Sequence, residues 1–146
     1  MAKLIDTCAQ ELMDTAPKIM QAIRVEMRRG LGANISIPQF RTLAFIQRNL
    51  DSSLSNLAEH LGLTLPSASK LVDGLVKQKL VIRQESKTDR RRLTLGLTAA
   101  GASIVNSART NAQANLAGKL EGLSLAELEA IHQTLQLLRP LFQQGR

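Results

Sequence analysis

The sequence predicts a mainly α-helical fold that carries one small β-hairpin. Apolar residues recur at spacings of three and four along most of the chain, which is the period of an amphipathic helix. One stretch, residues 81–97, instead has an apolar start, a polar middle and alternating leucines, which is typical of two strands joined by a loop. With 146 residues, 44% of them hydrophobic, the chain is long enough for one domain with its own core.

The first predicted helix covers residues 4–29. Its apolar positions run along one face from Ile5 to Met27 and include Cys8. Pro17 interrupts this pattern and predicts either a kink or two abutting helices, because proline removes a backbone donor and clashes with the preceding turn. A loop with two glycines follows.

Two further helices are expected before the middle of the chain. Ser36 is a suitable N-cap for the first of them, which has Pro38 in its first turn. Its expected buried residues are Phe40, Leu43, Ala44 and Ile46. Ser55 is expected to cap the second, a short helix that ends at Gly62.

Thr64 is expected to cap a fourth helix over residues 65–78, with an inward stripe from Ala68 to Val76. Strands are predicted at residues 81–84 and 92–97. Thr98 then caps a helix over residues 99–120. Ser124 and Glu127 form a capping box at the start of the last helix, which has Pro140 near its end.

The order of a helix, a short helix, a three-residue turn, a helix and a β-hairpin is that of a winged helix-turn-helix. In such proteins the N-terminal end of the second helix of the pair enters the major groove, and Thr64 caps that end here. Hydroxyl and basic groups on its outward side suit phosphates and base edges. The candidate DNA-binding residues there are Thr64, Ser67, Ser69, Lys70 and Lys77.

Positive charge is concentrated close to this helix. The net charge is +7, and residues 70–92 hold eight basic and three acidic residues. Such a field suits a polyanion such as nucleic acid, although charge alone fits a basic, solvated surface equally well. Arg90 and Arg91 in the hairpin loop are placed to reach the adjacent minor groove, which attracts arginine where it is narrow. Asp89 either orients one of these guanidinium groups or caps the loop.

Three segments together resemble the MarR family of bacterial transcription regulators: IPQFRTLAFI, LSNLAEHLGLTLPSASKLVDGLVKQKLV and DRRRLTLGLTAAG. The resemblance is close over residues 37–101. Its most diagnostic piece is an Asp-Arg-Arg followed by a strand and Leu-Thr-x-x-Gly. That pattern falls on Asp89, Arg90, Arg91, Leu97, Thr98 and Gly101. By resemblance, Pro66, Ser67 and Lys70 would meet bases, and Arg91 would enter the minor groove.

The resemblance implies a homodimer with two winged domains on a palindromic operator in double-stranded DNA. Residues 36–98 would form the DNA-binding domain, and residues 1–33 and 99–146 would supply dimerisation helices. Many members release DNA when a small ligand, often a phenolic acid, binds, so a ligand-responsive repressor is expected. The apolar stripes of the terminal helices support dimerisation independently, with a bundle inside one chain as the alternative.

One departure from the family pattern concerns the residue after the fourth helix. The family usually has glycine immediately before the leucine at this point, whereas this chain has Lys79 before Leu80. If that position needs a positive φ, lysine costs about 1 kcal/mol.

Few other residues are candidates for chemistry. Arg41 is a candidate for holding a ligand carboxylate, with a surface or dimer-contact arginine as the alternative. Cys8 is expected to be a buried structural thiol, with oxidant sensing as the alternative. No nucleophile triad, phosphate-binding glycine loop or metal-ligand pair is found, so we expect no enzyme activity, no cofactor and no metal. A single cysteine and no long apolar run predict a cytoplasmic protein outside the membrane.

A competing interpretation remains for the basic winged domain. It would belong to a protein-interaction module that binds an acidic partner protein. Sequence-specific retention of duplex DNA against heparin would separate the two interpretations.

Overall fold

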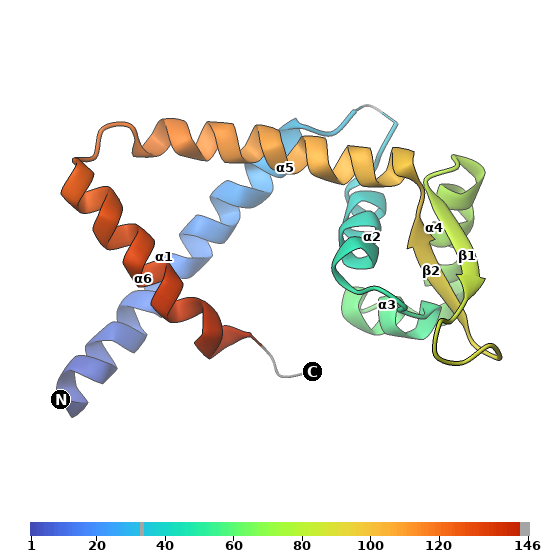
Figure 1. Cartoon of the computed structure of the whole chain (residues 1–146), viewed down its shortest axis with the longest axis horizontal. Coiled ribbons are helices and arrows are strands. Elements are labelled where there is room, and N and C mark those ends of the chain that lie inside the picture. Colours follow the sequence, from blue (N-terminus) through green and yellow to red (C-terminus); the bar gives the residue numbers. More distant parts are fainter. Residues whose placement is uncertain (33, 144–146) are drawn as a thin grey trace. The chain divides into compact units, whose positions relative to one another are not determined.

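A computed structural model describes residues 1–32 and 34–143. The chain divides into two compact units, Met1–Ala112 and Gln113–Arg146. The described residues form six α-helices and one antiparallel two-stranded sheet (Figure 1), which confirms the mainly helical class with one hairpin. The domain boundary predicted at Ala33, and the last three residues of the predicted C-terminal segment, lie outside the described residues.

Helix α1 (Ala2–Arg29) is one continuous helix with Pro17 inside it, so the alternative of two abutting helices is wrong. Helix α2 (Ile37–Arg48) begins as predicted. The Ser36 hydroxyl accepts a hydrogen bond from the Gln39 amide at 3.2 Å, and the Gln39 side chain accepts one from the Ser36 amide at 3.0 Å. This reciprocal pair fixes the start of α2.

The predicted cap of α3 (Leu54–Leu61) is wrong, because Ser53 caps this helix and Ser55 does not. The Ser53 hydroxyl accepts from the Asn56 amide at 3.1 Å, and the Asn56 side chain accepts from the Ser53 amide at 3.0 Å. Only a start at Leu54 places Asn56 where both bonds form. Asn56 thus occupies the capping-box position that glutamate or glutamine usually takes.

Helix α4 (Leu65–Lys77) is capped by Thr64, as predicted, and the turn before it depends on Gly62 at φ 68°. After its other end, Lys79 has φ 59°. The position where the family usually has glycine therefore does need a positive φ. The Leu80 amide donates to Leu75 O at 3.0 Å and the Lys79 amide donates to Val76 O at 3.0 Å. These two bonds form a Schellman motif with lysine in the left-handed position that glycine usually takes.

The hairpin joins β1 (Val81–Glu85) to β2 (Leu93–Leu97), with Val81 opposite Leu97 and Glu85 opposite Leu93. The strands are therefore close to their predicted positions, each within one residue at the loop end. On its other edge, β2 donates a backbone hydrogen bond, from the Leu95 amide to Ser52 O at 2.9 Å. The turn between α2 and α3 is thereby attached to the hairpin.

Helix α5 (Ala99–Leu120) begins after Thr98, whose hydroxyl accepts from the Gly101 amide at 3.1 Å. The same hydroxyl donates to Lys79 O at 2.7 Å. A Cβ on Gly101 would collide with Leu80 O. In the Leu-Thr-x-x-Gly sequence, the threonine hydroxyl thus bonds α5 to the end of α4, and the glycine lets the two segments approach closely.

Helix α6 (Leu125–Phe142) begins with the predicted capping box, since the Ser124 hydroxyl accepts from the Glu127 amide at 3.2 Å. Pro140 lies inside its last turn. No residue of α6 is buried.

None of the helices in the described part of the chain is both long and apolar enough to cross a membrane.

The core lies between α2, α3, α4, the hairpin and the first half of α5, which gather around one another in Figure 1. Phe40, Leu43 and Ile46 are buried as predicted, and Ala44 is half-buried. The buried aliphatic residues that join them are Leu57, Val72, Leu75, Leu80, Val81, Leu95 and Val105. This core holds α4 and the hairpin against the same support.

The apolar face predicted for α1 is mostly exposed along its first two-thirds, with Ile5 61% and Ile19 50% exposed. Cys8 is exposed as well, so the expectation of a buried thiol is wrong for the chain by itself. Towards the C-terminal end of α1, Met27 packs against the core. Amphipathicity predicted the helix correctly, but most of its apolar face is not buried within the single chain.

Candidate nucleic-acid interface

The N-terminal end of α4 is exposed, and the Thr64 and Ser67 side chains there are hydrogen-bonded to each other. The Thr64 hydroxyl accepts from the Ser67 amide at 3.3 Å and donates to the Ser67 hydroxyl at 2.9 Å. Thr64 therefore sets the first turn, and the Ser67 oxygen keeps acceptor capacity. The remaining amides of this first turn make the helix end attractive to an anion.

The predicted contact residues of α4 mostly share one exposed surface. Thr64, Pro66, Ser67, Lys70 and Lys77 are exposed, and Ser69 is half-buried. The opposite side of α4 is buried through Ala68, Val72 and Leu75. The helix is thus held by one side and presents hydroxyl groups and two ammonium groups on the other.

The wing loop, residues 86–92, connects the two strands and carries the densest positive charge. Arg90 and Arg91 are both exposed. The Asp89 carboxylate accepts from the Arg91 amide at 3.0 Å, and the Arg92 amide donates to Asp89 O at 3.1 Å. Asp89 thus caps the turn. Neither ion pair found among the described residues involves Asp89, so its carboxylate sets the Arg91 backbone and holds no guanidinium group there.

An ion pair that sequence reasoning did not predict connects the helix to the hairpin. The Arg83 guanidinium on β1 contacts the Asp73 carboxylate on α4. Asp73 is exposed on α4. Its charge is therefore met by Arg83, which leaves Lys70 and Lys77 as the basic groups of this surface.

The base of the wing loop is attached to the turn between α2 and α3, which sequence reasoning also missed. The Asp51 carboxylate accepts from the Ser86 hydroxyl at 2.9 Å. Hydrogen bonds from Ser86, the Lys87 amide and Thr88, together with the Arg92 charge, lower the pKa of Asp51 against the opposing effect of burial. Asp51 follows Leu50 in a polar turn, and no sequence signal connects that turn to residues 35 positions later.

Comparison with known proteins identifies the family of this arrangement. A model of the MarR family matches residues 33–92, the segment from the loop before α2 to the end of the wing loop. The uncharacterized HTH-type transcriptional regulator YfiV of Bacillus subtilis is 30% identical over 105 residues. That match covers 72% of this chain and 66% of the relative, just under two thirds of its length. The chain belongs to the MarR family.

Solved structures show the same MarR fold. The transcriptional regulator Tm0710 from Thermotoga maritima matches with a TM-score of 0.79 and 21% identity, over 92% of this chain and 95% of that one. MepR from S. aureus bound to ethidium bromide matches with a TM-score of 0.66 and 22% identity, over 90% and 96%. A MepR variant bound to an oligodeoxyribonucleotide matches with a TM-score of 0.59 and 21% identity, over 92% and 97%.

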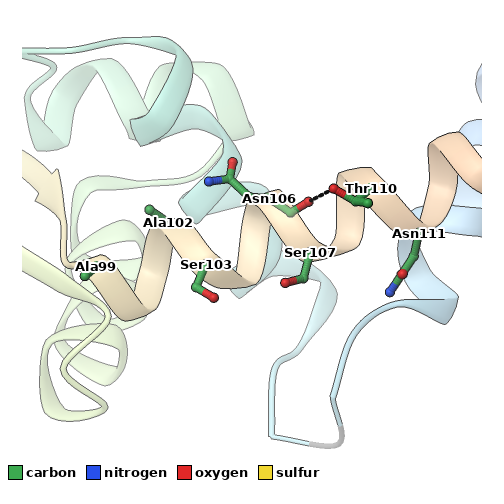
Figure 2. Close-up of a pocket in the computed structure, with 7 residues that line it drawn as sticks. All are labelled: Ala99, Ala102, Ser103, Asn106, Ser107, Thr110 and Asn111. Carbon is green, nitrogen blue, oxygen red and sulfur yellow. Dashed lines mark hydrogen bonds between the residues drawn. The ribbon is translucent and has the colours of Figure 1, made fainter.

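Two recesses of this MarR chain have volumes that a small molecule could occupy. The first, of about 720 Å³, is lined only by α5, from Ala99 to Asn111, and carries no charged side chain. Figure 2 shows Ser103, Ser107 and Asn111 projecting from one side of that helix. The second, of about 250 Å³, is lined by the end of α2, both strands and Ala102. Arg41 is exposed on α2 and lines neither recess.

Among the described residues, no group of three or more His, Cys, Asp or Glu side chains is placed to hold a metal ion. His60 instead stacks on Phe45, with ring centroids 4.7 Å apart.

Proposed function

We propose that the chain is a sequence-specific DNA-binding transcriptional regulator. One observation carries the proposal: α4 exposes Pro66, Ser67 and Lys70 in its N-terminal half, and the hairpin that carries Arg91 packs on the same core. Helix-turn-helix proteins insert such a helix end into the major groove. The structure of a MepR variant with an oligodeoxyribonucleotide supports this use of the fold.

The proposed contacts divide by chemistry. Ser67 and Lys70 approach base edges in the major groove, where a lysine ammonium favours guanine acceptors. Lys77 and Arg90 contact phosphates, which fix register and orientation without reading sequence. Arg91 enters the neighbouring minor groove, where a narrow groove concentrates negative potential.

We further propose that the chain acts as a homodimer on a palindromic operator. The support is apolar surface at both ends of the sequence: Leu4 and Met13 on α1 are 66% and 78% exposed, and Leu137 and Leu141 on α6 are 74% and 75% exposed. Exposed apolar groups of this number mark a protein interface. A two-fold dimer would present two α4 helices and so require two half-sites.

The regulator is proposed to be a repressor that responds to a small aromatic or phenolic ligand. The support is the MepR structure with ethidium bromide, which shows that this fold holds an aromatic molecule in a relative. Arg41 and Cys8 remain the candidates for a ligand carboxylate and for oxidant sensing. Both are exposed, so a ligand or an oxidant can reach them in the single chain.

Selection of bound duplexes from a random-sequence pool tests the proposal directly. We expect recovery of a palindrome whose half-sites lie about one helical turn, roughly 34–36 Å, apart. Binding that heparin abolishes for every duplex alike would contradict sequence-specific recognition. It would instead favour an acidic protein as the partner of the basic surface.

A further inference from the structure

The wing loop is held by one carboxylate that lies outside both DNA-facing elements. Asp51 stands in the turn between α2 and α3 with φ 62°, a left-handed conformation that aspartate tolerates better than most residues. Its Oδ2 accepts from the Ser86 hydroxyl at 2.9 Å and from the Thr88 hydroxyl at 3.3 Å. Its Oδ1 accepts from the Lys87 amide at 3.2 Å. Three consecutive residues of the wing loop therefore donate to one side chain.

Ser86 connects Asp51 to the next residues of the wing loop through hydrogen bonds. It is 4% exposed, and its oxygen also accepts from the Thr88 amide at 3.2 Å and the Asp89 amide at 3.3 Å. Since its own proton points to Asp51, both lone pairs are left to accept from the loop amides. Asp89 then accepts from the Arg91 amide, so a continuous chain of hydrogen bonds leads from Asp51 to the Arg91 backbone.

The returning side of the loop is attached to the same turn. The Arg92 guanidinium donates to Asp51 O and to Asn56 Oδ1, each at 3.1 Å. Asn56 in turn completes the cap of α3. Arg90 and Arg91 thus lie between two attachment points on the support of the helix-turn-helix, and Arg92 serves as an attachment although it belongs to the arginine run.

We propose that Asp51 is a positioning residue that holds the wing loop in the conformation in which Arg91 meets DNA. The inference rests on the proposed DNA-binding function and adds a residue that makes no contact with DNA itself. A loop held at both ends loses less conformational freedom on binding than a mobile one. The carboxylate therefore favours binding, although its negative charge opposes the approach of phosphates.

Because the charge of Asp51 repels phosphates, its loss by itself would raise DNA affinity, whereas loss of its hydrogen bonds would lower it. Asp51→Asn removes a negative charge, keeps the side-chain size and tolerates a positive φ, but it replaces one acceptor oxygen with a donor. By charge alone this variant should bind DNA more tightly. If Asp51 positions the wing loop, binding should weaken by about tenfold, as loss of a charged hydrogen bond implies.

The measurement is a fluorescence-anisotropy titration at fixed salt. The probe is a labelled duplex selected from a random pool by the wild-type protein. Glu85→Gln is the matched control, because it removes the same charge from an exposed carboxylate beside the loop, at the end of β1, and should bind at least as tightly as wild type. Ser86→Ala leaves the charge unchanged and should weaken binding in the same direction as Asp51→Asn.

A double variant shows whether the effect passes through the wing. In an Arg91→Ala background, Asp51→Asn should cost little further affinity, because the residue that Asp51 positions is gone. Hydrogen exchange at the amides of Lys87, Thr88 and Asp89 should become faster in Asp51→Asn, while exchange at Leu95 stays unchanged. This pattern separates a loosened loop from a loosened fold.

Three results would overturn the inference. Asp51→Asn could bind as tightly as Glu85→Gln, its cost could add fully to that of Arg91→Ala, or the loop amides could exchange at the wild-type rate. Each of these would leave the DNA-binding function standing. Wild-type protein that retains no duplex from the random pool would instead refute the proposed function, and the positioning role with it.

Discussion

Lys79 shows how one residue can preserve a motif at an energetic cost. It occupies the left-handed position after α4, where lysine's Cβ crowds the following carbonyl group. The position cannot easily relax, because the neighbouring amides of Lys79 and Leu80 bond back to the last turn of α4. The Lys79 carbonyl also accepts from Thr98. The backbone geometry is thus imposed by its surroundings and not by the residue.

Lys79→Gly should therefore stabilise the protein. We expect the free energy of unfolding to rise by about 0.5–1 kcal/mol, since relief of the left-handed conformation exceeds the extra backbone entropy of glycine in the unfolded chain. Urea unfolding followed by circular dichroism measures this change. The control is Lys70→Gly, an exposed position in the interior of α4, which should lower stability by about 1 kcal/mol. Equal losses for both variants would contradict the interpretation.

Gly101 illustrates the opposite constraint, in which a side chain is forbidden by packing. An alanine Cβ there would collide with the Leu80 carbonyl oxygen, which is backbone and cannot rotate away. That oxygen also accepts from the Thr98 amide at 3.1 Å. Any displacement of Leu80 would therefore disturb the junction of α4, β1 and α5.

Gly101→Ala should lower the free energy of unfolding by about 1–3 kcal/mol, as overpacking in a well-ordered site does. Gly118→Ala in the same helix is the matched control, because nothing lies within 4 Å of its added Cβ. That substitution should stabilise the helix by up to about 1 kcal/mol. Thermal unfolding of both variants measures these changes. An unchanged stability of Gly101→Ala would contradict the interpretation, because it would show that the backbone at Leu80 can shift without cost.

At the scale of elements, α4 and the wing act together because they share supports. The Arg83–Asp73 ion pair joins β1 to α4, and Ser52 O joins the α2–α3 turn to β2. An exposed ion pair of this kind contributes little stability, on the order of 0–1 kcal/mol, so orientation is its more important effect. These contacts set the placement of the wing relative to α4 in the single chain.

Arg91→Ala should weaken binding to the selected duplex by about tenfold or more, with little change in stability, because its side chain is exposed. The logarithmic salt dependence of affinity should also become shallower by about one unit if the guanidinium displaces a counterion. Titrations at several salt concentrations measure both effects. Arg24→Ala, which removes an exposed arginine from α1, should leave both quantities near the wild-type values. Unchanged affinity for Arg91→Ala would remove the wing from the mechanism.

At the scale of the whole molecule, the exposed apolar residues of α1 and α6 are the main unexplained feature of a single chain. They contrast with the core formed by α2, α3, α4, the hairpin and the first half of α5, which buries its own aliphatic residues. Exposed leucines in such number favour association, since each buried leucine contributes about 1.5–3 kcal/mol. The proposed homodimer would bury them.

Leu141→Lys should accordingly weaken self-association by at least about tenfold, because a charged group would enter the proposed interface. Gln133→Lys on the same helix adds the same charge at a polar, exposed position and serves as the control. Analytical ultracentrifugation over a range of concentrations measures the dimer constant. A wild-type protein that sediments as a monomer throughout that range would refute the dimer.

Much of the fold could be predicted because its signals are local. The caps at Ser36, Thr64, Thr98 and Ser124 depend on bonds to amides three residues away, and all four are confirmed. Ser55 was a wrong prediction, because Ser53 is an equally suitable cap and only the side chain of Asn56 decides between them. The exposed surface of α4 and the wing arginines were predicted from the same kind of pattern.

The sequence by itself determined which segments are helices and strands, where most of them begin, and which residues form the basic surface. Those features depend on periodicity, capping and charge within a few residues. Only the tertiary structure decided how the wing is held. The bonds from Ser86 to Asp51, from Arg92 to Asn56 and from Thr98 to Lys79 join residues 35, 36 and 19 positions apart. Single polar pairs at such separations leave no periodic signal, since the chain brings them together only after its core has packed.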